Sequence, residues 1–123
     1  MELLFWIYLV NAVLLIDHEV DSAYWKEWDL FGIKGGIQFF LFIHLPAFGA
    51  ILYGLVEISR GTSAGLIYSL VLAGIGIFAL SIHSFFLLRG RKEFTLPFSI
   101  FLLGATGIVS VFQLIITIRL LTA

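Results

Sequence analysis

The sequence contains no cysteine and few charged residues. Without cysteine, the chain has no disulfide, no thiolate metal site and no dithiol redox chemistry. Charged residues make up 12% of its 123 residues, about half of the roughly 25% that is typical of soluble domains. So few charges cannot cover the apolar core of a soluble domain, and the outer surface must therefore face lipid.

Two other features are missing. There is no excess of positive charge, because the net charge is −1, and this argues against electrostatic recognition of nucleic acid. The N-terminus also lacks the marks of a cleaved signal peptide. Glu2 stands where a basic residue is usual, and no small-x-small site follows the apolar run. We therefore expect the first apolar stretch to be a retained helix.

Long apolar stretches dominate what is present. The chain is 61% hydrophobic, with a mean hydropathy of +1.10. A membrane crossing needs about 20 apolar residues, and four stretches approach or exceed that length. The sequence predicts one all-α domain over residues 1–123, an integral membrane four-helix bundle with spans at about 2–20, 35–57, 64–88 and 97–121.

The segment that follows the first predicted span has a different composition. DHEVDSAYWKEWDLFGIKGG, which begins at Asp17, holds five of the eight acidic residues and two of the three tryptophans. Amphipathic rings favour the depth of the lipid headgroups. We expect a short amphipathic, acidic and aromatic segment at the interface, in which Tyr24, Trp25 and Trp28 anchor the chain or contact a partner.

The three histidines are predicted to lie in the same half of the membrane. His18 follows the short first span, His44 is about ten residues into the second, and His83 is about six residues from the end of the third. At ~1.5 Å per residue these positions have similar depths. Imidazoles at one depth favour a site for zinc, iron or manganese. A haem between His44 and His83 is a variant, and histidines that only bond the backbone are the structural alternative.

Carboxylates next to His18 could supply acid–base chemistry. His18 and Glu19 resemble the start of the zinc-protease signature H-E-x-x-H, but residue 22 is Ser, so that motif fails. Glu19 or Asp21 could still move a proton beside a bound metal. The resulting hypothesis is a metal-dependent intramembrane enzyme on a lipid-like substrate, with His18, His44 and His83 as ligands.

The last predicted span carries polar residues that recur at a spacing of three to four residues. They are Ser99, Thr106, Ser110, Gln113 and Thr117. Small and hydroxyl-bearing residues commonly join helices by hydrogen bonds inside membranes. We expect them to join helices in this way, with the lining of a polar cavity as the alternative.

The strings HEVDSAYWKEW from His18, GGIQ from Gly35 and HLP from His44 resemble an uncharacterised family of small bacterial four-span membrane proteins. The resemblance covers essentially the whole chain, and most of its specificity lies between His18 and Pro46. It implies a four-span architecture and a bacterial inner membrane location. It implies no activity.

Three classes of function remain open at this stage. The enzyme requires the three imidazoles within a few ångströms of one another. A non-enzymatic subunit or scaffold, with a protein partner or a second copy of the chain besides the bilayer, requires exposed aromatic residues after the first span. A small transporter or proton-relay protein requires polar groups in the opposite half of the membrane.

Overall fold

The computed structural model describes all residues 1–123 and contains five α-helices and no strand. In chain order these are α1 (Glu2–Tyr24), α2 (Glu27–Leu30), α3 (Gly36–Ser59), α4 (Ser63–Leu88) and α5 (Pro97–Thr122). Pro97 occupies the first turn of α5, where its missing N–H costs nothing. Thr62 caps α4 by accepting a hydrogen bond from the backbone N–H of Gly65.

Four of the helices are long and apolar enough to cross a membrane. They contain 23 to 26 residues, which at ~1.5 Å per residue exceeds the roughly 30 Å of a hydrocarbon core. The first helix continues through the acidic residues to Tyr24, beyond the apolar stretch. The chain is therefore a multi-pass membrane protein.

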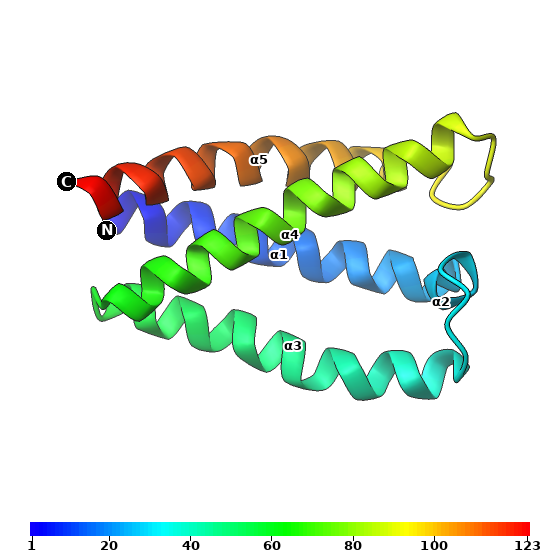
Figure 1. Ribbon diagram of the computed structural model, residues 1–123, viewed down its shortest axis with the longest axis horizontal. Coiled ribbons are helices and arrows are strands. Elements are labelled where there is room, and N and C mark those ends of the chain that lie inside the picture. The colour runs from blue at the N-terminus through cyan, green and yellow to red at the C-terminus, as the bar shows by residue number, and fades with distance from the viewer.

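The long helices lie side by side, as Figure 1 shows. α5 packs against α1 and α4, and α3 packs against α1 and α4. Both chain termini and the α3–α4 turn lie at one end, while α2 and the α4–α5 loop lie at the other (Figure 1). A Cβ atom at Gly65 would lie 2.7 Å from the backbone nitrogen of Ile58, so α3 and α4 can meet this closely only because residue 65 is glycine.

α3 is much less buried than the other long helices. In its most apolar 18 residues 11% are buried, against 33% to 39% in the other three. Its buried residues are Phe40 near the start and Gly54, Glu57 and Ile58 near the end. The middle of α3 therefore presents side chains that no other helix covers.

A hydrogen-bonded group joins α1, α4 and α5 in the interior. This amide network consists of Asn11, Ser69, Ser110, Gln113 and Thr117, all fully buried. The Asn11 Nδ2 atom donates to Ser110 Oγ at 2.9 Å and to Gln113 Oε1 at 2.8 Å. Gln113 Nε2 donates to both the carbonyl and the hydroxyl of Ser69 at 3.0 Å. These residues hydrogen-bond one helix to another, as the spacing of the polar residues on α5 predicts.

Candidate functional site

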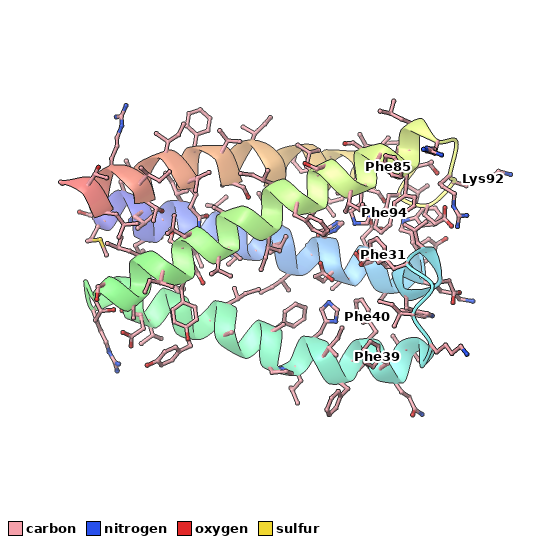
Figure 2. All side chains as sticks on the ribbon, in the orientation of Figure 1. Phe31, Phe39, Phe40, Phe85, Lys92 and Phe94 are labelled. Carbon is pink, nitrogen blue, oxygen red and sulfur yellow. The ribbon has the colours of Figure 1, made fainter.

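Most ionisable side chains of the interior gather at the end of the molecule that carries α2. We call His18, Glu19, Glu27, His44 and His83 the imidazole–carboxylate cluster. Figure 2 shows aromatic side chains around this end, with Phe31 and Phe94 toward α4 and Phe39 and Phe40 on α3. The cluster draws on α1, α2, α3 and α4, so only the folded chain brings it together.

His44 and Glu19 form the closest pair in the cluster. His44 Nδ1 lies 2.7 Å from the carbonyl oxygen of Phe40, and since a carbonyl only accepts, Nδ1 must carry a proton. His44 Nε2 lies 2.6 Å from Glu19 Oε2. One further proton therefore lies between the imidazole and the carboxyl group, on either partner. The His44 ring also stacks on Phe40, with 3.8 Å between the ring centroids.

His83 and Glu27 form a second pair. His83 Nε2 lies 3.3 Å from Glu27 Oε1, and the histidine is almost fully buried. A tight turn after α1 makes this approach, because Lys26 adopts a left-handed backbone conformation with φ of 52°. Burial acts to raise the pKa of the Glu27 carboxyl, but the side chains of His83 and Ser22 outweigh it and hold the pKa below its usual value.

His18 lies between the two pairs. Its ring centroid is 4.9 Å from that of His83 in an edge-on arrangement. Its Nε2 atom is 4.0 Å from Glu19 Oε1, and its buried Nδ1 atom makes no hydrogen bond. His83 Nδ1 also lacks a hydrogen bond, and the 3.3 Å contact of His83 Nε2 with Glu27 does not have the geometry of a hydrogen bond. Buried polar atoms without partners are uncommon and costly, and they often mark functional sites.

Phe94 covers the two inner histidines from the α4–α5 loop. Its ring centroid lies 4.1 Å from that of His83 and 5.6 Å from that of His18. The side chain is 1% exposed, although it belongs to a polar loop. Its φ of 64° is unusual for a bulky residue. Such backbone strain persists only when the surrounding packing enforces it.

A cavity of about 200 Å³ lies beside the cluster, between α1, α2 and α3. Glu19, Glu27 and His44 supply its polar surface, and the other lining residues are apolar: Trp28, Phe31, Ile33, Phe39, Phe40 and Ile43. Several of these apolar side chains are also exposed on the outside of the protein. The ionisable groups can therefore be reached from the surface.

The predicted set of three histidine ligands is not supported by the geometry. His18 and His83 adjoin each other, whereas His44 faces Glu19 instead. No group of three or more His, Asp or Glu side chains comes together in a way that could hold a metal ion. The reason is that α3 and α4 diverge from their turn toward the end that carries α2 (Figure 1), and His44 faces Glu19 of α1 rather than His83.

Asp21 and the predicted interfacial aromatics occupy different environments. Asp21 Oδ1 accepts a hydrogen bond from Trp25 Nε1 at 3.1 Å, and it lines no part of the cavity. Trp25 also reaches Ser99 on α5 at 3.4 Å. Trp28 packs on Phe40 with ring centroids 5.6 Å apart. Of the three aromatic residues only Tyr24 is strongly exposed, at 69%.

Sequence reasoning missed two residues of the site, Glu27 and Phe94. The acidic segment contained Glu27, but its position after the Lys26 turn decides that it faces His83, and the turn gives no clear signal in the sequence. Phe94 offered a weak signal, since it is a single aromatic residue in the polar loop Arg89–Pro97.

Neither a curated protein nor a solved structure matches this chain. A family model described as a family of unknown function, DUF6713, matches residues 4–120. That match includes every residue of the imidazole–carboxylate cluster, the whole of α3 and α4, and all but two residues of each of α1 and α5. The chain therefore belongs to this family of unknown function, DUF6713.

Proposed function

We propose that the protein is a membrane-embedded enzyme that uses general acid–base catalysis on a lipid-like substrate. In this proposal the four long helices form a transmembrane bundle, and α2 lies at the membrane interface. Glu19 and His44 are the acid–base pair, and His18 and Glu27 support their charge states. A bacterial inner membrane is the expected location.

The shared proton of Glu19 and His44 carries the proposal. Because His44 Nδ1 donates its proton to the Phe40 carbonyl, the pair can hold or release a proton only at the contact between His44 Nε2 and the Glu19 carboxyl group. A group that gains or loses one proton next to a cavity is what general acid–base catalysis needs. Ionisable residues inside membranes are costly, and they commonly serve function.

The surroundings of the pair indicate what kind of molecule it acts on. The cavity walls are mostly aromatic and aliphatic, and the segments that join the four long helices are short. A substrate must therefore arrive through the lipid or at its surface. Cavities for drug-sized ligands occupy about 300–1,000 Å³, so a space of about 200 Å³ fits a headgroup better than a whole lipid.

Mass spectrometry of lipids tests the proposal. The purified protein is incubated in vesicles made from a total bacterial lipid extract, and the lipid species are quantified over time. We expect one species to be consumed by the unaltered protein and left intact by Glu19→Gln and by His44→Phe, because both substitutions remove the shared proton.

The matched control is Gln38→Leu, which changes an exposed polar residue of α3 outside the cluster and should keep full turnover. Equal lipid profiles with the unaltered protein and Glu19→Gln, while both remain folded by circular dichroism, would contradict the proposal.

A divalent metal is the second candidate, favoured by one observation. The Nε2 atoms of all three histidines face a carboxylate, at 2.6 Å for His44, 3.3 Å for His83 and 4.0 Å for His18. A histidine that donates Nδ1–H to a backbone carbonyl, as His44 does, also has the orientation typical of metal ligands. Because these side chains do not converge on one point, binding of zinc, iron or manganese would require Glu19 and Glu27 to change their positions.

Metal analysis separates the two candidates. Purified protein is loaded with zinc, iron(II) or manganese and its metal content is measured after desalting. Near-stoichiometric metal that is lost in Glu19→Gln would favour the metal centre, and lipid turnover that persists after chelation would favour the metal-free pair.

A further inference from the structure

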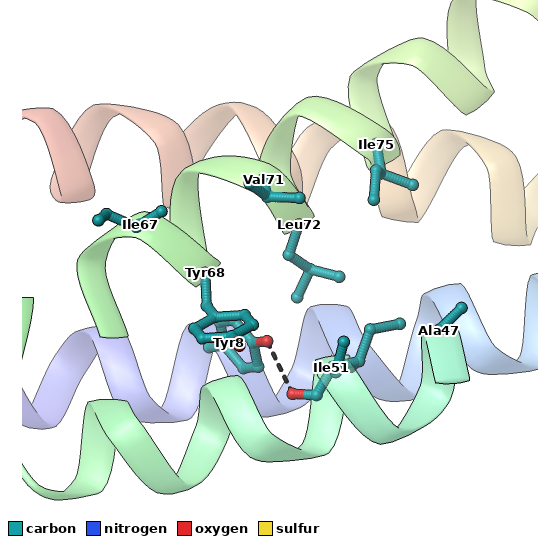
Figure 3. A pocket seen from close by; sticks show the side chains of 9 residues that line it. Tyr8, Ala47, Ile51, Ile67, Tyr68, Val71, Leu72 and Ile75 are labelled. Atoms are coloured by element: carbon teal, nitrogen blue, oxygen red, sulfur yellow. Dashed lines mark hydrogen bonds between the residues drawn. The ribbon is translucent and has the colours of Figure 1, made fainter. Parts of the chain in front are cut away.

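A second, wholly apolar cavity lies between α3 and α4. It measures about 230 Å³, and nine residues line it: Tyr8, Ala47, Ala50, Ile51, Ile67, Tyr68, Val71, Leu72 and Ile75. Figure 3 shows Ala47 and Ile51 on α3 facing Val71 and Leu72 on α4. The Tyr8 hydroxyl donates to the Ile51 carbonyl at 2.7 Å toward the end near Tyr68 (Figure 3).

The two cavities follow one another along one face of α3. His44 lines the first cavity, whereas Ala47 and Ile51 line the second. These residues are spaced i, i+3 and i+7, so they share a helix face. Seven residues at ~1.5 Å each carry this face about 10 Å into the membrane from His44. The small side chains of Ala47 and Ala50 keep the space between α3 and α4 open.

The first cavity has the charge of a cation site. Glu19 and Glu27 line it, and no lysine or arginine lines either cavity. Trp28, Phe31 and Phe40 add aromatic faces, which attract organic cations through their ring quadrupoles. An anionic headgroup would meet the Glu27 carboxylate and be repelled.

The geometry points to one elongated site for a single-chain amphiphile with an amine headgroup. The amine lies among Glu19, Glu27 and the aromatic rings, and the hydrocarbon chain lies along α3 in the apolar cavity. This inference rests on the proposed function, since it names the substrate class of the same site. It also explains why the middle of α3 stands uncovered.

Photo-crosslinking tests this arrangement. The protein in phosphatidylcholine nanodiscs is exposed to a dodecylamine that carries a diazirine near the end of its chain, and the labelled residues are mapped by mass spectrometry. We expect labels on Ile51, Val71 or Ile75 that unlabelled dodecylamine displaces. A fatty acid probe of the same length should label these residues weakly. Loss of the Glu27 charge in Glu27→Gln should weaken binding roughly tenfold.

Two substitutions on α3 provide the matched test of the apolar part. Ala50→Trp fills the cavity and should abolish the displaceable labels. Leu45→Trp adds the same side chain at a site that is 80% exposed and lines neither cavity, so it should leave them unchanged. Equal labelling by the amine and the fatty acid, or labels spread evenly over the lipid-facing helices, would overturn the inference.

The photo-crosslinking experiment and the lipid-turnover experiment can fail separately, and each failure has a different meaning. If Glu19→Gln stops lipid turnover but the amine probe does not bind, the substrate class is wrong and the acid–base pair stands. If the amine binds as expected and no lipid is consumed, the site is a binding site and the enzymatic proposal fails.

Discussion

Two polar regions occupy the interior of this protein, and they differ in charge and in access to a cavity. In the amide network every residue is uncharged, fully buried and bonded to another helix. In the imidazole–carboxylate cluster the groups are ionisable and one side borders a cavity. Three ring nitrogens there, on His18 and His83, make no hydrogen bond.

This difference indicates that the amide network serves helix packing and that the imidazole–carboxylate cluster is the better candidate for chemistry. A neutral network in which a single buried atom, Asn11 Oδ1, lacks a partner holds helices together at little electrostatic cost. A cluster with unpaired nitrogens and two carboxylates is costly to bury, and packing alone does not require it. The cluster is also closed by a loop residue, Phe94, whereas the amide network lies wholly on helices. Function is therefore better sought in the cluster.

The largest effect is expected at Phe94, because it covers the cluster. Phe94→Ala removes a buried ring that contacts His18, His83 and Trp25, and a buried Phe→Ala change typically costs about 3–5 kcal/mol. Thermal unfolding in detergent should show this loss. Hydrogen–deuterium exchange should rise in the α4–α5 loop while α1 around Asn11 stays protected.

The control for Phe94 is Phe78→Ala, which removes the same ring from a site on α4 that is 63% exposed. Its effect should stay within about 0.5 kcal/mol. If both substitutions destabilise equally, Phe94 does not act as a cover and the contrast between the two regions weakens.

The next effect is expected in the amide network. Gln113→Leu removes three hydrogen bonds, one from Asn11 and two to Ser69, and leaves buried polar atoms unpaired at a cost of about 2 kcal/mol. Lipid turnover and amine binding should persist in the folded fraction. Gln38→Leu, at an exposed site without a hydrogen bond, should change the unfolding temperature little. Loss of turnover in folded Gln113→Leu would show that the two regions are not separable.

The helices follow from the sequence more fully than the site does. Four apolar stretches predict four long helices because span length and hydropathy are local properties of the chain. The shared depth of the histidines is local too, and it correctly suggests that His18 and His83 can meet. Where His44 points depends on how far α3 stands from α4. The pairing of Glu27 depends on the Lys26 turn. Both are tertiary features that periodicity does not encode.

A smaller effect is expected for one hydroxyl group of the amide network. Ser69→Ala removes the hydrogen bonds to Thr117 and Gln113 but keeps the backbone carbonyl that Gln113 also uses. Interhelical hydrogen bonds in membranes are worth about 0.6 kcal/mol on average, and we expect that loss in unfolding experiments. Ser81→Ala, at an exposed site on the same helix, is the control. A loss above about 2 kcal/mol would mean that the network is more cooperative than separate bonds.

The smallest effect is the dependence of stability on pH at Glu27. Its pKa lies below the ordinary value of 4.5, because the side chains of His83 and Ser22 outweigh the opposing effect of burial. The stabilisation is therefore fully present above pH 4.5 and is lost as the pH falls through the lower pKa of the folded state. Measured between pH 6 and pH 3, the free energy of unfolding of the unaltered protein should fall with this loss. Glu27→Gln should make the free energy of unfolding depend less steeply on pH. Asp29→Asn, at an exposed neighbouring site, should leave the dependence as it is in the unaltered protein. An unchanged slope in Glu27→Gln would mean that the His83–Glu27 pair contributes no charge-dependent stability, and the cluster would then differ from the amide network through Glu19 and His44 alone.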